Sequence, residues 1–316
     1  MNVRLNVKSI LIENTADDLR DVFLRCDADI LESAREIRIR QGLPLAVTGN
    51  AGEFFLGREG DRHKRAETAF KPRGVHIESM LSKLSNHSLY AYDTEIKNGY
   101  ITIAGGHRIG LSGRVTVENG RIKTIKHISG LSIRVARQIL GAADAIFPVI
   151  TDDYVRNTII VSPPGYGKTT MLRDVVRRLS CAGYNVAVVD ERSEIGGCHM
   201  GVAQNDLGPR TDILDAAPKA EGMMLALRAL SPQVIAVDEI GSAEDVLAIE
   251  NMAGCGVAVI CTLHGRNMAD LQRRPTLAPL IANKIIERYV FLKDKPKLGS
   301  VWAIYDENLR EVRHDN

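Results

Sequence analysis

A glycine-containing loop is the segment of this sequence whose chemistry is clearest. It lies between an apolar run and an amphipathic one and reads Ser162-Pro163-Pro164-Gly165-Tyr166-Gly167-Lys168-Thr169-Thr170. Backbone N–H groups of such a turn, and of a helix that begins after it, can converge on phosphate oxygens because glycine has no Cβ in the way. The sequence therefore predicts a phosphate-binding loop made of Pro164, Gly165, Tyr166, Gly167, Lys168, Thr169 and Thr170. Ser162 stands where the usual motif has its first glycine.

Two side chains of this loop and two carboxylates elsewhere predict a nucleotide and a metal. A lysine at position 168 reaches the β- and γ-phosphates of ATP, and a hydroxyl at Thr169 binds Mg²⁺. Asp238 and Glu239 directly follow the apolar run 234–237. We expect Asp238 to orient the shell of the Mg²⁺ ion and Glu239 to position or activate the attacking water. ATP and Mg²⁺ are the expected ligands.

Two further apolar runs end in polar residues. The first is followed by Asp190, Glu191 and Glu194, one of which serves either as a base or as an outer metal partner, or else forms a helix cap or salt bridges. The second is followed by Thr262 and His264, which are placed to sense the γ-phosphate by hydrogen bonding. A zinc site is the alternative for Cys255, Cys261 and His264, but their spacing matches no standard zinc pattern.

The elements that must position these residues follow from hydrophobic patterning. The runs 158–161, 186–189, 234–237 and 257–260 are continuously apolar, which is typical of parallel strands covered on both faces. Met171, Leu172, Val175, Val176 and Leu179 share one face of a helix that Gly183 closes. These patterns predict a three-layer α/β domain, in which ligands bind beyond the carboxyl ends of the strands.

The first half of the chain predicts a separate, mixed domain. Alternating residues indicate strands at 36–40, 45–48, 100–104, 114–117 and 132–135, and Asn119-Gly120 favours a hairpin turn. Small residues near 141–143 and Pro148 suggest a connector over 141–156. We expect an N-terminal α/β domain at residues 1–147 and the phosphate-loop domain at 148–316.

Composition excludes several classes of protein. The 316 residues suit about two domains, and 45% apolar with 25% charged residues is ordinary globular composition. A net charge of +2 and 5% aromatic residues disfavour a nucleic-acid binder. No apolar run is long enough for a membrane span, and five cysteines without a CxxC pair disfavour a disulfide framework. A soluble, intracellular protein is expected.

The order of these motifs resembles the secretion ATPase superfamily, the RecA-like motors of type II and type IV secretion and of pili. Leu227-Arg228-Ala229-Leu230-Ser231-Pro232 is similar to the approach to its Walker B strand, and Thr262-Leu263-His264 to its histidine box. By the same match, Glu194 is a carboxylate of the aspartate box and Glu239 the Walker B glutamate. The resemblance implies catalytic roles for Lys168, Glu194, Glu239 and His264. Asp238 departs from the glycine usual there in pilus and type II motors, and their four-cysteine module is absent.

Four longer stretches resemble the stage III sporulation protein AA family across nearly the whole chain, namely residues 36–45, 106–114, 204–212 and 218–224. This resemblance implies an N-terminal domain joined to a RecA-like P-loop ATPase domain in a homo-hexameric ring. It also implies a cytoplasmic motor that lies at the membrane through channel proteins and energises transport between mother cell and forespore.

Arginines complete the active sites of many ring ATPases from a neighbouring subunit. In related motors the arginine comes from the N-terminal domain, which makes Arg108, Arg114 and Arg134 candidates, with surface salt bridges as the alternative. Arg210 could also face a neighbour or the pore. Two other functions stay open: a RecA-like nucleic-acid-dependent ATPase, and an ATP-binding scaffold with little turnover.

Overall fold

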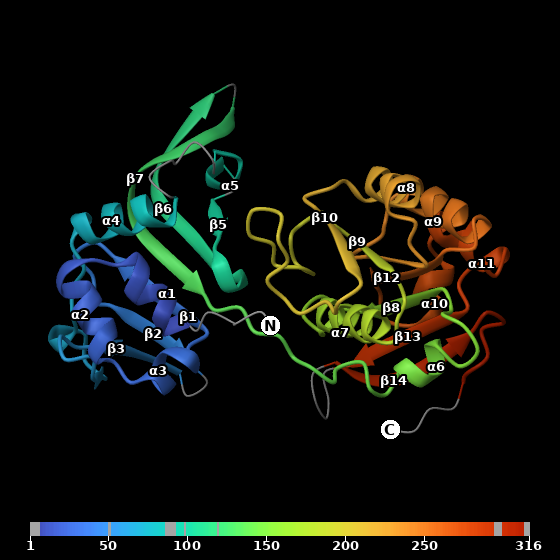
Figure 1. The fold of residues 1–316 in the computed structure, drawn as a ribbon, viewed down its shortest axis with the longest axis horizontal. Helices are drawn as coiled ribbons and strands as arrows, with labels where there is room; N and C mark the ends of the chain where they lie inside the picture. Colours follow the sequence, from blue (N-terminus) through green and yellow to red (C-terminus); the bar gives the residue numbers. More distant parts are fainter. Residues whose placement is uncertain are drawn as a thin grey trace. The chain divides into compact units, whose positions relative to one another are not determined.

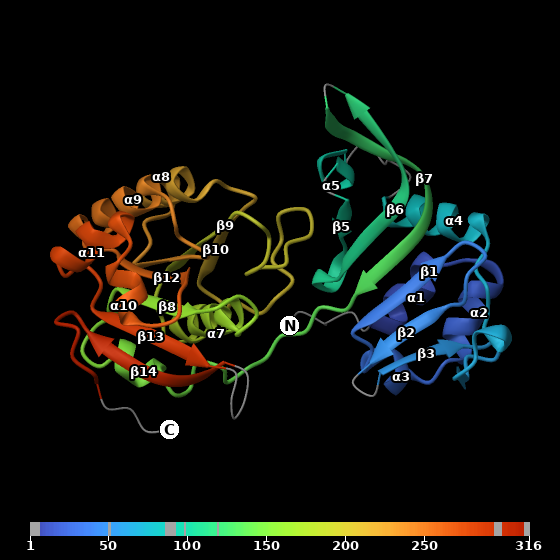
Figure 2. The same ribbon diagram turned by 180° about the vertical axis from the view of Figure 1, so that it is seen from behind.

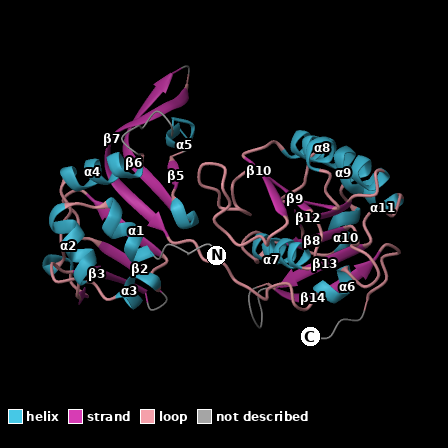
Figure 3. Ribbon diagram, viewed as in Figure 1, coloured by secondary structure: helices cyan, strands magenta, loops and turns pink. Residues whose placement is uncertain are grey.

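The chain forms two compact units, and each is described by itself. The computed structural model describes residues 7–49, 52–85, 93–97, 99–118, 120–293 and 299–312. The units are Met1–Arg137, the N-terminal unit, and Gln138–Asn316, the C-terminal unit. Figure 1 labels their elements and Figure 3 shows that both contain helices and strands.

In the described part of the N-terminal unit, seven strands form an antiparallel sheet that is accompanied by helices. Its helices are α1 (Val7–Asn14), α2 (Asp17–Arg25), α3 (Ala28–Glu32), α4 (Gly74–Leu84) and α5 (Asp93–Lys97). Its strands are β1 (Glu36–Arg40), β2 (Ala46–Gly49), β3 (Gly52–Leu56), β4 (Arg62–His63), β5 (Tyr100–Thr102), β6 (Arg108–Glu118) and β7 (Arg121–Arg134). They are arranged in the order β4-β3-β2-β1-β7-β6-β5.

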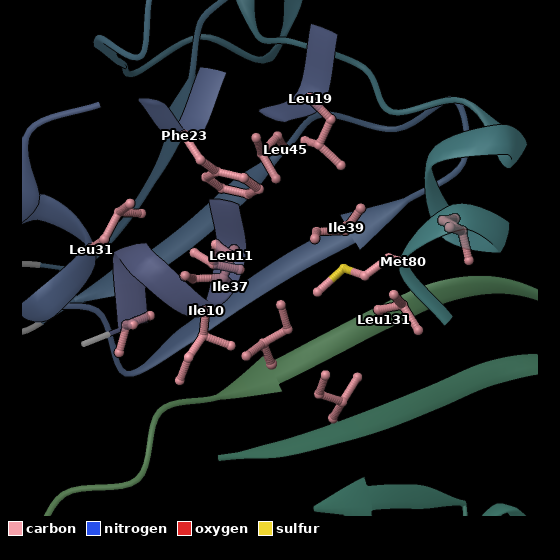
Figure 4. Packing of buried hydrophobic residues seen from close by; sticks show 14 of the residues in the cluster. Ile10, Leu11, Leu19, Phe23, Leu31, Ile37, Ile39, Leu45, Met80 and Leu131 are labelled. Atoms are coloured by element: carbon pink, nitrogen blue, oxygen red, sulfur yellow. The ribbon is translucent and has the colours of Figure 1, made fainter. Parts of the chain in front are cut away.

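One face of this sheet is packed against helices and the other carries charge. Ile37 and Ile39 of β1 are fully buried, and Figure 4 shows them beside side chains of α1, α2 and α4. Because side chains alternate along a strand, Arg38 and Arg40 lie on the opposite face. Strand β1 thus confirms the period-2 prediction at 36–40.

Strands β6 and β7 are much longer than the short strands expected at 114–117 and 132–135. They pair from Arg108 with Arg134 to Glu118 with Arg121, so the hairpin lies where Asn119-Gly120 predicts it. Asn119 itself lies outside the described residues. Glycines such as Gly113 interrupt the sequence pattern. The paired backbones nonetheless continue past it, with an irregular register between Ser112 and Arg114.

The C-terminal unit contains the predicted parallel sheet. Its helices are α6 (Phe147–Ile150), α7 (Lys168–Cys181), α8 (Lys219–Leu230), α9 (Ala243–Gly254), α10 (Met268–Gln272) and α11 (Ala278–Ala282). Its strands are β8 (Thr158–Ser162), β9 (Val186–Asp190), β10 (Thr211–Asp215), β11 (Val234–Val237), β12 (Ala258–His264), β13 (Arg288–Lys293) and β14 (Ser300–Asp306). The order is β10-β9-β11-β12-β8-β13-β14, parallel except for the pair β13–β14.

Alternate residues of these strands enter two different cores, which makes three layers. Ile159 and Val161 of β8 pack with α8 and α9, whereas Ile160 packs with α7. Figures 1 and 2 show α7 apart from the α8–α9 pair. This double burial explains the continuous apolar runs in the sequence. We did not predict β10, β13 or β14.

The segment 138–147 belongs to the C-terminal unit, although we expected the boundary after residue 147. The buried Asp174 of α7 accepts a hydrogen bond from the N–H of Ala143 at 2.9 Å, and Arg178 contacts Asp144 at 2.5 Å. These contacts with α7 fix the segment to this unit. Among the described residues, no helix has the length and apolar character needed to cross a membrane.

Candidate active site

Four parallel strands bring the predicted site residues to one edge of the C-terminal sheet. His264 at the end of β12 is in register with Ser162 at the end of β8. On the other side, Val237 of β11 is in register with Cys261 of β12 and with Val189 of β9. Because the strands are parallel, the loops that follow β8, β9, β11 and β12 all leave from this edge.

The loop predicted to bind phosphate joins β8 to α7. Gly165 and Gly167 have φ angles of 78° and 89°, a left-handed conformation that glycine adopts at low cost. Ser162 is still part of the extended strand, where a residue with a Cβ fits. Lys168 is the first residue of α7, and its ammonium group donates to the carbonyl oxygens of Ser162 at 3.0 Å and Pro163 at 3.1 Å. Burial lowers the pKa of Lys168, while Asp238 and Glu239 act against that change.

Thr169 and Asp238 are in direct contact. The hydroxyl of Thr169 donates to Oδ2 of Asp238 at 2.7 Å. The other carboxylate oxygen of Asp238 accepts hydrogen bonds from the Thr262 hydroxyl and from the N–H of Glu239. A hydroxyl and an oriented carboxylate are oxygen ligands that suit Mg²⁺. The residues predicted to hold the metal are therefore adjacent and chemically fitting.

Glu239 has an unusual backbone and a fully engaged carboxylate. Its φ angle is 50°, and its N–H and C=O contact Thr262 at 2.9 Å and Lys219 at 3.0 Å. Oε1 lies 2.8 Å from Nε2 of His264, and Oε2 accepts from the Arg192 guanidinium at 2.8 Å. A non-glycine residue in this region costs free energy and persists only where its surroundings fix it, as they do here.

His264 links the phosphate loop to Glu239. Its Nδ1 lies 3.0 Å from the ammonium group of Lys168, and its Nε2 faces Glu239. An ammonium group only donates, so Nδ1 is the acceptor and the ring proton lies on Nε2. The geometry thus assigns a neutral histidine that donates its Nε2–H to Glu239.

The loop after β9 is built around Asp190. This buried carboxylate accepts hydrogen bonds from the N–H groups of Glu194, Ile195 and Gly196 at 2.8 to 2.9 Å. Burial raises the pKa of Asp190, although these three hydrogen bonds lower it. Glu194 is held through its main chain, since its C=O accepts from Arg173 at 2.6 Å. A catalytic role for Glu194 stays a prediction.

Arg192 and Lys219 are two residues of the site to which the sequence pattern assigns no role. Arg192 reaches Glu239 from the loop after β9. Lys219, at the start of α8, lies 3.2 Å from Glu191 and donates to the C=O of Glu239. Lys219 lies in the stretch 218–224 that resembles the family, and Arg192 lies between the carboxylates of Asp190 and Glu194. Their partners lie far away in sequence, so nothing local assigned them a contact.

A cavity of about 300 Å³ lies beside the phosphate loop. One side of the cavity is lined by Gly167, Thr170 and Met171. The other sides are lined by Ala142 with neighbouring residues of 139–145 and by residues 299–301. Its size and its mainly small and apolar lining suit the base and sugar of a nucleotide. A larger groove of about 540 Å³ lies between α8 and α9 and contains no residue of the phosphate loop.

The candidate arginines of the N-terminal unit have different surroundings. The guanidinium of Arg108 lies over the ring of Tyr100, 4.6 Å from its centroid. The backbone of Arg114 is in register with that of Lys126 on the other strand of the hairpin. Arg134 lines a hollow of about 360 Å³ on the open face of the sheet, together with Arg38 and Arg40.

Arg210 precedes β10 in the C-terminal unit. Its guanidinium donates to the side chain of Asn185, which precedes β9. Arg210 therefore lies at the amino ends of these strands, away from the edge that carries the phosphate loop.

Comparison with known proteins places the chain in a family. The family model described as Sporulation stage III, protein AA matches residues 6–312. Stage III sporulation protein AA of Bacillus subtilis (strain 168) is 42% identical over 278 residues, which are 86% of this chain and 87% of that protein. Protein transport protein HofB homolog of Escherichia coli (strain K12) is 27% identical over 183 residues, 52% of this chain and 38% of that protein.

Solved structures share the fold. The pilus retraction motor PilT with bound ADP matches with a TM-score of 0.59 at 18% identity, covering 88% of this chain and 79% of that one. The ATPase DotB of Legionella pneumophila matches with a TM-score of 0.52 at 16% identity, covering 82% and 72%. These likenesses confirm the predicted RecA-like P-loop fold. With its sequence matched over nearly its whole length, the chain belongs to the Sporulation stage III, protein AA family.

Proposed function

We propose that this protein is a Mg²⁺-dependent ATPase motor of the secretion type. The observation that carries the proposal is the set of direct contacts that joins Lys168, Thr169, Asp238, Glu239 and His264 at one sheet edge. Phosphoryl transfer needs positioned charges more than covalent chemistry, and this set supplies a cation, metal ligands and a base.

The residues divide the work of hydrolysis between them. Lys168 exchanges its carbonyl partners, Ser162 and Pro163, for phosphate oxygens of ATP. Thr169 and Asp238 would hold Mg²⁺, which when bound would neutralise charge on the phosphates. Glu239 accepts a proton from the attacking water, and the Nε2–H of His264 orients its carboxylate. The cavity that Gly167 and Met171 line takes the base and sugar.

An arginine from a neighbouring copy completes the site in a homo-hexameric ring. Arg134 is the best candidate, because Arg108 is stacked on Tyr100 and Arg114 lies beyond the sheet core on the hairpin. Arg134 shares its hollow with Arg38, Arg40 and the carboxylate of Glu36, which pairs with Arg38, so the hollow keeps a net positive charge suited to an anion. Such a finger accelerates hydrolysis on the order of 10³–10⁵-fold.

The ring energises a sporulation transport channel between mother cell and forespore. The family description, the protein-transport relative and the fold of a pilus motor support this role. The protein works in the cytoplasm and is held at the membrane by channel proteins. A net charge of +2 supports a protein partner rather than nucleic acid.

Two substitutions test the chemistry. Lys168→Ala should abolish ATP hydrolysis, and Glu239→Gln should still bind ATP but hydrolyse it roughly 10²–10³-fold more slowly, because a base is lost. Glu311→Gln is the control, since Glu311 is an exposed carboxylate after β14. If Glu239→Gln hydrolyses ATP as fast as the parent, Glu239 does not act on the water.

Recovery of the tagged protein from sporulating cells tests the biology. We expect membrane proteins to be recovered with it, and ring assembly to be accompanied by phosphate release. Recovery of nucleic acid alone, with stimulation of the ATPase by single-stranded DNA, would favour the nucleic-acid motor. Ring assembly with ATP but without phosphate release would favour the scaffold.

A further inference from the structure

Glu239 lies within a chain of four side chains. The ammonium group of Lys168 contacts Nδ1 of His264 at 3.0 Å, and Nε2 of His264 contacts Oε1 of Glu239 at 2.8 Å. Arg192 then donates to Oε2 of Glu239 at 2.8 Å. Each oxygen of this carboxylate therefore has its own donor, one from β12 and one from the loop after β9.

The main chain of Glu239 does not fix its carboxylate. The backbone is held by Asp238, Thr262 and Lys219, which contact its N–H and C=O. Three side-chain torsions still separate that backbone from the carboxyl group. His264 restrains one oxygen, but the carboxylate could still rotate about that single contact. The contact from Arg192 to the other oxygen prevents this rotation.

The loop that carries Arg192 is itself rigidly held. Asp190 accepts three backbone N–H groups just after Arg192, and Glu191 just before it pairs with Lys219. Arg192 is 62% exposed, so solvent screens the ion pair and its strength is modest. Its contribution is one of geometry, because a planar guanidinium on a fixed loop directs a carboxylate well.

We propose that Arg192 is a positioning residue that orients the Glu239 carboxylate toward the attacking water and acts on hydrolysis through Glu239. This inference rests on the proposed ATPase function. It assigns to the loop after β9 a role in hydrolysis that does not require contact with the nucleotide.

The first experiment separates turnover from binding. Arg192→Gln should lower kcat about fivefold, the size of effect expected for one exposed ion pair, with KM for ATP and Kd for ADP changed by less than about twofold. Arg192→Lys should restore part of kcat. Arg266→Gln is the matched control, because Arg266 is an exposed arginine just after His264 at the same edge. A raised KM with unchanged kcat would place Arg192 on the nucleotide and overturn the proposal.

A double-mutant cycle tests whether Arg192 acts through Glu239. In the Glu239→Gln background, Arg192→Gln should change kcat by less than about twofold, because the carboxylate that Arg192 orients is already gone. If the fold losses of kcat in the two single variants multiply in the double variant, Arg192 does not act through Glu239.

Side-chain NMR of the nucleotide-free protein gives a readout independent of turnover. Arg192→Gln should shift the carboxyl carbon resonance of Glu239, because Oε2 loses its guanidinium donor, whereas Arg266→Gln should leave that resonance in place. A parent without ATPase activity would refute the proposed function, yet a shifted resonance would still confirm the contact. An unchanged resonance and unchanged kcat in an active enzyme would refute the role of Arg192 alone.

Discussion

Replacing Asp190 by asparagine and by alanine should separate hydrogen bonding from charge in the loop after β9. Oδ2 of this buried carboxylate accepts from the N–H groups of Ile195 and Gly196, and Oδ1 accepts from that of Glu194. An asparagine oxygen can keep the Ile195 and Gly196 bonds and lose only the third. Alanine loses all three.

The expected costs follow from this count. A buried N–H left without an acceptor costs about 1–3 kcal/mol, so Asp190→Ala should lower the free energy of unfolding by about 3–5 kcal/mol, with water reaching the half-buried Glu194. Asp190→Asn loses one hydrogen bond but avoids burying a charge, the effect that raises the pKa of Asp190. We expect a cost of about 1 kcal/mol for asparagine.

Urea unfolding followed by tryptophan fluorescence measures these costs in the C-terminal unit, which contains Asp190. The chain has one tryptophan, Trp302 of β14, which contacts Phe291 in the C-terminal unit. Asp212→Asn is the control, since Asp212 is exposed in the neighbouring strand β10. If asparagine costs as much as alanine, the charge and not the hydrogen bonds holds the loop. If asparagine abolishes ATP hydrolysis without loss of stability, Asp190 acts in the chemistry.

The pH dependence of the asparagine variant has a definite sign. Folded Asp190 has a raised pKa, so below it the folded chain binds a proton more readily than the unfolded chain. The parent therefore gains stability from this residue as pH falls from that pKa toward 3.8, and asparagine does not. The cost of Asp190→Asn should thus be larger near pH 4.5 than near pH 7.5, on the order of tenths of a kcal/mol or more.

The remaining predictions concern the N-terminal unit and the nucleotide cavity. His107 is buried, which lowers its pKa from 6.5 to about 4, and its Nδ1 accepts from the N–H of Ala136. Between pH 6.5 and 4 the unfolded chain binds a proton at His107 more readily than the folded chain does. The free energy of unfolding of this unit should therefore fall by up to about 3 kcal/mol over that range. His107→Gln should flatten that loss in urea unfolding followed by circular dichroism, and an unchanged slope would contradict this assignment. Ala142→Trp should fill the cavity beside the phosphate loop and weaken ATP binding about tenfold or more, while binding of inorganic triphosphate stays as in the parent. If a binding titration shows that ATP and triphosphate binding weaken equally, the base of ATP does not lie in this cavity.

Local patterns predict much of the C-terminal unit. The apolar runs that became β8, β9, β11 and β12 are recognisable because strands buried on both faces need apolar residues at every position. The loop around Lys168 and the Asp238-Glu239 pair follow such strands directly. Short segments of the chain are therefore enough to predict their chemistry.

Other elements lack such a local signal. Strand β10 reads Thr211-Asp212-Ile213-Leu214-Asp215 and lies at the sheet edge, where its side chains remain partly exposed. The long pair β6–β7 contains glycines and two register shifts, and the pairing between the two strands keeps both strands extended. In both cases the neighbouring strand, and not the pattern of the strand itself, makes the element regular.

The sequence alone predicted the loop around Lys168 with its acidic partner, the three-layer domain and the family, because short segments of the chain carry the signal for each. Only the tertiary structure decided which side chains hold Glu239. Arg192 and His264 are 47 and 25 positions from Glu239. They meet it because four parallel strands end at one edge, and a contact of this kind arises from the order of the strands in the sheet, which no local pattern contains.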